Sequence, residues 1–139
     1  MPNTITNPKF FSAGNAVFTI SNESGEHLTF KIRKGKGQWE KFFAVFYLTG
    51  PDNTSSYTYL GKFNPYQLRA TPTAKSVMVE DAKPFRVLNW AVKQVAEHKE
   101  LPIGYNIQHE GKCCRCGRRL TTPTSIDNGI GPECIKYFQ

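Results

Sequence analysis

Hydrophobic and polar residues alternate along much of the first half of the chain with the period of two that is typical of β-strands. In segment 27–33 the apolar residues at even positions would share one face, opposite Thr, Lys and Arg. Segments 16–20 and 57–63 are short and rich in β-prone residues, whereas segment 42–48 is apolar on both faces, as in a central strand. The pattern predicts an antiparallel sheet of three to five strands.

A helical period replaces this alternation after Pro84, a residue that suits the first turn of a helix. Apolar residues then recur every three or four positions, at Phe85, Leu88, Val92 and Val95. We predict a helix over 84–99 that packs on the apolar face of the sheet, which gives an α+β domain over residues 1–104. Residues 1–14 are predicted to be a loose arm, and residues 64–76 to be irregular.

All four cysteines lie after residue 112. Cys113 and Cys116 form a C-x2-C pair followed by Gly117, a spacing at which two thiolates can bind one ion if the chain turns sharply, as glycine permits. Cys134 follows Cys116 after 17 intervening residues and stands directly after Pro132-Glu133, where a helix start would stabilise a thiolate. The spacing predicts a treble-clef-like zinc finger over residues 105–139, with Zn2+ as the cofactor.

A structural zinc ion takes four ligands, and two residues compete for the fourth place. His109 precedes the C-x2-C pair on an incoming strand, and Cys114 lies inside the pair, where its side chain should point away from the ion. We predict His109 as the ligand and Cys114 as a packed thiol. A redox pair would need a helix after the cysteines, and disulfides would need an oxidising compartment; neither is indicated.

The chain is basic, with 18 Lys and Arg against 11 Asp and Glu, a formal net charge of +7. This balance favours a polyanionic partner and argues against an acidic mimic of nucleic acid. Arginines on a metal-fixed turn are suited to hold phosphates. The predicted nucleic-acid contacts are Lys31, Arg33, Lys34 and Lys36 in the sheet region, and Lys112, Arg115, Arg118 and Arg119 around the cysteine turn.

Aromatic residues on or near the predicted strands could add a stacking surface for single-stranded nucleic acid if they face solvent. They are Trp39, Tyr47, Tyr57 and Tyr59. The alternative is that they belong to the core, where aromatic side chains are common.

The leading functional hypothesis is a zinc-finger protein that binds nucleic acid without catalysis. Catalysis at zinc needs an open coordination position and a base, and a shell closed by His109 leaves neither; Glu110 and Glu133 flank the ligands but are expected to be solvated. The second hypothesis is a protein-interaction module that inhibits or redirects a host enzyme or defence system. DNA or RNA, strandedness and oligomeric state stay open.

No basic stretch followed by an apolar run opens the chain, and its longest strictly apolar run, 42–48, is too short to span a bilayer. These features predict a cytoplasmic protein that is not associated with a membrane.

The C-terminal pattern His109-Glu110-Gly111-x-Cys113-x-x-Cys116-Gly117-Arg118-x-Leu120, followed by Gly129-Ile130-Gly131-Pro132-x-Cys134, resembles a family of small phage and prophage proteins of unknown function. Segments 14–19 and 48–61 are similar too. The resemblance implies a phage-encoded protein of the host cytoplasm. It supports His109 as a ligand, because this position belongs to the family pattern, and it treats Cys114 as incidental, because a glycine is expected there. It supplies no activity.

Overall fold

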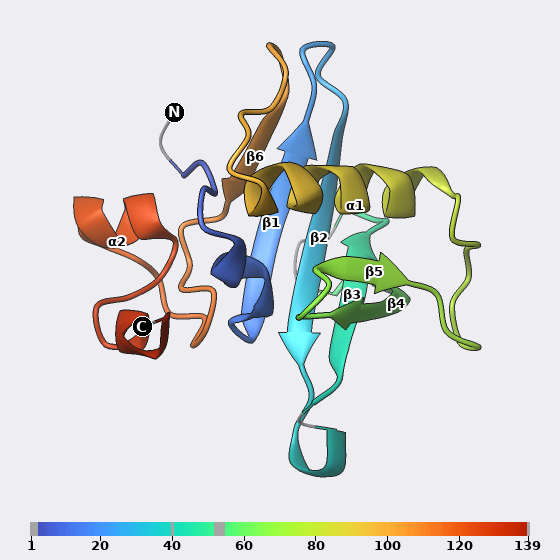
Figure 1. Ribbon diagram of the computed structural model, residues 1–139, viewed down its shortest axis with the longest axis horizontal. Helices are drawn as coiled ribbons and strands as arrows, with labels where there is room; N and C mark the ends of the chain where they lie inside the picture. Colours follow the sequence, from blue (N-terminus) through green and yellow to red (C-terminus); the bar gives the residue numbers. More distant parts are fainter. Residues whose placement is uncertain (1–2, 40, 52–54, 139) are drawn as a thin grey trace.

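The fold is an α+β arrangement built on one antiparallel sheet, seen in a computed structural model that describes residues 3–39, 41–51 and 55–138. Within these residues the sheet has six strands in the order β5-β4-β3-β2-β1-β6 (Figure 1). The strands are β1 Asn15–Ser21, β2 His27–Lys34, β3 Phe43–Leu48, β4 Tyr57–Asn64, β5 Arg69–Thr71 and β6 Asn106–His109.

The sheet is larger than the three to five strands predicted. β5 lies inside the segment predicted to be irregular, and its three residues are too few to show a period of two. β6 lies inside the predicted finger and pairs with β1, from Phe18 opposite His109 to Ser21 opposite Asn106. The last strand of the sheet therefore leads directly into the cysteine segment.

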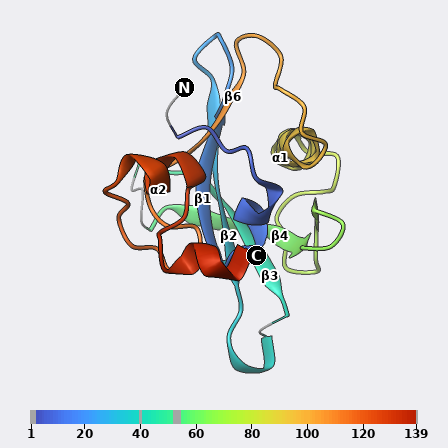
Figure 2. The same cartoon turned by 60° about the vertical axis from the view of Figure 1, so that its left-hand side comes forward.

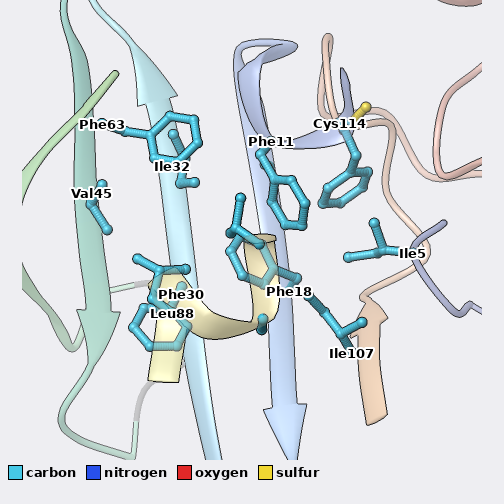
Figure 3. Packing of buried hydrophobic residues seen from close by; sticks show 14 of the residues in the cluster. Ile5, Phe11, Phe18, Phe30, Ile32, Val45, Phe63, Leu88, Ile107 and Cys114 are labelled. Atoms are coloured by element: carbon cyan, nitrogen blue, oxygen red, sulfur yellow. The ribbon is translucent and has the colours of Figure 1, made fainter. Parts of the chain in front are cut away.

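Helix α1, Lys83–Ala96, covers one face of the sheet, as Figure 2 shows. Its buried side chains include Phe85, Leu88 and Val92, which belong to the same hydrophobic cluster as Phe18, Phe30 and Ile32 of β1 and β2. Figure 3 shows Leu88 beside Phe30. The spacing predicts a helix to residue 99, but His98 adopts a positive φ of 56°, a left-handed conformation that a continuing helix does not allow.

The N-terminal segment is not a loose arm; that prediction is wrong. Asn7 caps a 3-10 helix, η1 (Pro8–Ser12), and Phe10 and Phe11 are 1% and 0% exposed. Phe11 packs edge-on against Phe18 of β1, with ring centroids 5.1 Å apart (Figure 3). Two adjacent phenylalanines give no period, so their burial depends on the sheet and on α1 around them.

The opposite face of the sheet carries polar and aromatic side chains. Cross-strand pairs place Lys31 opposite both Val17 and Phe46, and Phe46 opposite Tyr59. We call the side chains of Lys31, Arg33, Phe46, Tyr57 and Tyr59 the open face. No helix among the described residues is long and apolar enough to cross a membrane.

Candidate metal centre and basic surface

Three of the four cysteines converge after β6. The Sγ atoms of Cys113, Cys116 and Cys134 all lie within 4.8 Å of one another. The turn that brings the first two together is closed by backbone hydrogen bonds from Gly117 to Cys113 and from Cys113 to Arg118. Gly117 takes a φ of 80°, which glycine adopts without strain.

The second half of the segment delivers Cys134. Thr122 caps the short helix α2, Pro123–Asn128, through its side chain, and Gly129 ends it in the left-handed region with a φ of 69°. A Cβ at Gly129 would lie 3.0 Å from the Phe10 ring, so the finger packs tightly on η1. Cys134 then opens the 3-10 helix η3, Cys134–Phe138.

The Cys113 sulfur is surrounded by hydrogen-bond donors. Burial by itself raises the pKa of its thiol, but the N–H groups of Cys116 and Gly131, 3.5 and 3.3 Å from Sγ, favour the thiolate and bring the pKa down to about 7. Burial raises the pKa of Cys134, which the Arg115 guanidinium 3.5 Å from its Sγ partly offsets. Two of the three sulfurs thus have donors that stabilise the negative charge a metal ligand carries.

His109 lies outside this group. Its Nδ1 accepts the Gly111 N–H at 2.9 Å, so its Nε2 carries the hydrogen and donates to the Ile126 carbonyl oxygen at 2.5 Å. The ring is 4% exposed and lies beside Phe10, and burial lowers its pKa. Both ring nitrogens are engaged by backbone atoms. His109 would have to break one of these bonds to act as the fourth ligand, and that role stays a prediction.

Cys114 lies between Cys113 and Cys116 in the sequence but does not join the three-sulfur group. It is fully buried in the hydrophobic core, where burial raises the pKa of its thiol (Figure 3). Its backbone N–H donates to the Gly129 carbonyl, and its carbonyl accepts the N–H of Asn15. Cys114 thus connects the finger to β1, and it is not part of the three-sulfur group.

A cavity of about 430 Å³ adjoins the three sulfurs, and Arg118 and Arg119 line it. Both arginines are exposed, and neither forms an ion pair with another described residue. Arg115, also predicted to contact nucleic acid, instead lies over the Tyr137 ring, 3.5 Å from its centroid. This contact holds Arg115 against η3, and its predicted contact with nucleic acid stays a prediction.

The remaining predicted basic residues divide into two sets. Lys31, Arg33 and Lys112 line one cavity between the open face and the cysteine turn. Lys34 and Lys36 are exposed at the end of β2 and in the loop that follows. Their contact with nucleic acid stays a prediction.

Only part of the predicted aromatic surface is present on the open face. Tyr57 and Tyr59 lie there, whereas Tyr47 lies opposite Phe30 and packs against the core. The side chain of Trp39 is not among the side chains that the structure describes. Sequence reasoning missed Phe46, whose ring contacts Tyr59 at 5.8 Å between centroids. Its place in an all-apolar strand gave no signal that it faces away from the core.

Comparison with known proteins covers the cysteine segment alone. The sequence profile of a family of unknown function, DUF6011, matches residues 107–139, from β6 to η3. No curated protein and no solved structure matches the chain. The segment that holds the three-sulfur group is therefore similar to an uncharacterised family.

Proposed function

We propose that this chain is a zinc-finger protein that binds nucleic acid without catalysis. The observation that carries the proposal is the position of Arg118 and Arg119, two exposed guanidinium groups on the turn that the cysteine group organises. Guanidinium groups bind phosphate through paired hydrogen bonds, and a rigid turn lowers the entropy lost on binding. The net charge of +7 adds long-range attraction for a polyanion.

Zinc suits the donor set. Zinc–sulfur bonds of about 2.3 Å in a tetrahedron place the sulfurs about 3.8 Å apart, so the three thiols need only a small closure from their separations of up to 4.8 Å. Cys113, Cys116 and Cys134 would hold the ion, which would supply an ordering free energy to the small finger. A thiolate-bound ion needs reduced cysteines, which fits the cytoplasmic location that we propose.

Two arrangements can complete the tetrahedron. His109 can give up the Ile126 bond and turn toward the ion, as the sequence pattern suggests, or a solvent molecule can take the fourth place. The proposed role without catalysis depends on the first arrangement, because a solvent molecule in the fourth place would leave an open coordination position. Glu133, beside Cys134, is exposed and pairs with Lys136 at 3.4 Å. The visible spectrum of the cobalt-substituted protein separates a nitrogen from an oxygen fourth ligand.

The test is a double substitution, Arg118→Ala with Arg119→Ala, read by fluorescence anisotropy with labelled DNA and RNA strands. Affinity should fall roughly tenfold or more for every sequence, because the lost contacts are to phosphates. The matched control is Arg86→Ala with Lys93→Ala on α1, which removes the same charge from exposed positions of the helix. Equal affinities for both double variants would contradict the proposal.

A protein partner is the second candidate, and one surface favours it. Val87, Trp90, Pro102 and Tyr105 line an apolar cavity of about 370 Å³ beside α1, and nearby Ile103 is 98% exposed. Exposed apolar groups of this kind are typical of interaction sites. A host protein recovered in stoichiometric amount with the wild type and lost with Trp90→Ala would favour this role; co-purifying nucleic acid would favour the first.

A further inference from the structure

A recessed cavity of about 220 Å³ lies where the open face meets the cysteine turn. Lys31 and Arg33 reach it from β2, Lys112 from the segment before Cys113, and Tyr57 from β4. These residues come from three separate parts of the chain. The fold, and not the sequence spacing, therefore creates the site.

The three cations are crowded without matching anions. Burial lowers the pKa of Lys31, and the positive charges of Arg33 and Lys112 lower it further. None of the three forms an ion pair with a described carboxylate. Glu110 also lines the cavity and partly offsets the charge, but three positive groups against one negative group leave a net excess. Arg33 and Lys112 are exposed, so solvent screens part of this repulsion, and an anion in the cavity would offset the remainder.

Tyr57 brings a neutral donor to the same cavity. Its hydroxyl oxygen is buried and has no hydrogen-bond partner among the described residues. Lys31 Nζ lies 4.1 Å from the centroid of its ring. Burial, with a smaller effect of Glu110, raises the pKa of Tyr57 to about 12, so the phenol keeps its proton at neutral pH. A buried donor without an acceptor is costly, and because Tyr57 lines the cavity, an anionic oxygen that reaches its hydroxyl would satisfy it.

We propose that this cavity binds a backbone phosphate of single-stranded nucleic acid, held by Lys31, Arg33 and Lys112 and by a hydrogen bond from the Tyr57 hydroxyl. The inference rests on the proposed function and adds the strandedness of the ligand and a second contact surface.

Two features favour a single strand. The cavity is smaller than the pockets that hold drug-sized ligands, and it is recessed between the sheet and the cysteine turn. The flexible backbone of a single strand can place a phosphate in such a cavity more easily than the backbone of a rigid duplex can. The half-buried rings of Phe46 and Tyr59 lie on the same sheet face, where neighbouring bases can stack.

The experiment measures anisotropy with a labelled 12-nucleotide strand and with its duplex. Lys31→Met and Lys112→Met should each weaken single-strand binding roughly tenfold and lower the salt slope by about 0.7. Glu110→Gln should strengthen binding, because Glu110 is the only described residue lining the cavity that carries a negative charge. Lys93→Met on α1 is the control of equal charge and should bind like the wild type.

Tyr57→Phe separates a binding role from a structural one. Removing a buried hydroxyl without a partner should leave the unliganded protein as stable as the wild type, or more stable, while single-strand binding weakens several-fold. If Tyr57→Phe and the two lysine variants bind like Lys93→Met, the cavity is not the phosphate site. If the duplex binds as tightly as the single strand, and these variants weaken duplex binding equally, the proposed preference for a single strand is wrong.

These outcomes are distinct from failure of the proposed function. If the wild-type protein binds neither strand nor duplex, both the proposed function and this inference are wrong. If binding depends on Arg118 and Arg119 but not on Lys31 and Lys112, the proposed function stands and only the assignment of the cavity as a phosphate site is wrong.

Discussion

His109 Nε2 donates to the carbonyl oxygen of Ile126, while His109 Nδ1 accepts the N–H of Gly111. One buried ring thereby joins the end of β6 to α2, 17 residues later. This double backbone bond gives His109 a role in positioning the finger that does not require it to touch a metal.

We expect His109→Asn to keep bound zinc and to lose stability. Asparagine can still accept the Gly111 N–H but cannot reach Ile126, and one lost buried hydrogen bond costs roughly 1–3 kcal/mol. Metal content by mass spectrometry and thermal unfolding of the loaded protein test this. A variant with an intact sheet that no longer holds zinc would make His109 the fourth ligand, as the sequence pattern predicts.

The same residue predicts a pH dependence. Burial holds the pKa of His109 below its ordinary value of 6.5, although the Ile126 carbonyl works in the opposite direction. As the pH falls below about 6.5, the unfolded chain takes up a proton before the folded chain does. The stability that the neutral ring contributes is therefore present above pH 6.5 and lost as the pH falls toward the lowered pKa.

We expect the stability difference between wild type and His109→Asn to shrink as the pH is lowered through this window. Both proteins are measured with zinc bound, so that protonation of the thiolate ligands affects them alike. A difference that stays constant from pH 7.5 to the acid limit of folding would contradict a buried neutral ring.

Two neighbouring cysteines should respond in opposite ways to the same substitution. Cys116→Ser should weaken zinc binding strongly and leave the sheet intact, because the side chain is exposed on the turn and its sulfur belongs to the three-sulfur group. Cys114→Ser should keep zinc and lose roughly 1–3 kcal/mol, because it buries a hydroxyl in an apolar core. Metal titration and chemical unfolding of both variants provide the measurement. Loss of zinc in Cys114→Ser with the core intact would make Cys114 a ligand.

Gly129→Ala should be more damaging than Gly25→Ala. Both glycines have a positive φ, 69° and 85°, but an added Cβ at Gly129 would lie 3.0 Å from Phe10, whereas one at Gly25 meets nothing within 4 Å. Left-handed strain costs roughly 1–3 kcal/mol at either site, and overpacking adds a similar amount at Gly129 alone. Thermal unfolding should rank the variants in this order; equal losses would show that η1 can move away.

A strong chelator should loosen the finger and spare the sheet. The turn around Cys113 and helix α2 contain few large buried side chains, whereas β6 is held by its pairing with β1. Amide hydrogen exchange should therefore accelerate at Gly117, Gly129 and Ile135, whose N–H groups are bonded within the finger, and stay slow in β1 and β2. Unchanged protection of these finger amides in chelator would show that zinc does not order the segment.

Local pattern accounts for the elements that the sequence predicts well. The alternation at Leu28, Phe30 and Ile32 marks β2 because neighbouring side chains of a strand point to opposite faces, and the spacing from Phe85 to Val95 marks α1 because a helix repeats every 3.6 residues. Short elements without a period escape such reasoning. β5 is one, and its Ala70 is paired through both backbone groups with the Asn89 side chain of α1, a contact between residues 19 apart.

The spacing of Cys113, Cys116 and Cys134 by itself determined which sulfurs can meet, because a tight turn and a following helix start leave few other ways to place them. The sequence also predicted Cys114 as a packed thiol, because its side chain lies between two ligands that face the ion. Only the tertiary structure decided the contacts of His109 and Arg115, which depend on the distant Ile126 carbonyl and Tyr137 ring. Likewise, Lys31, Lys112 and Tyr57 share a cavity because strand pairing brings distant segments together, and residue type alone does not encode that proximity.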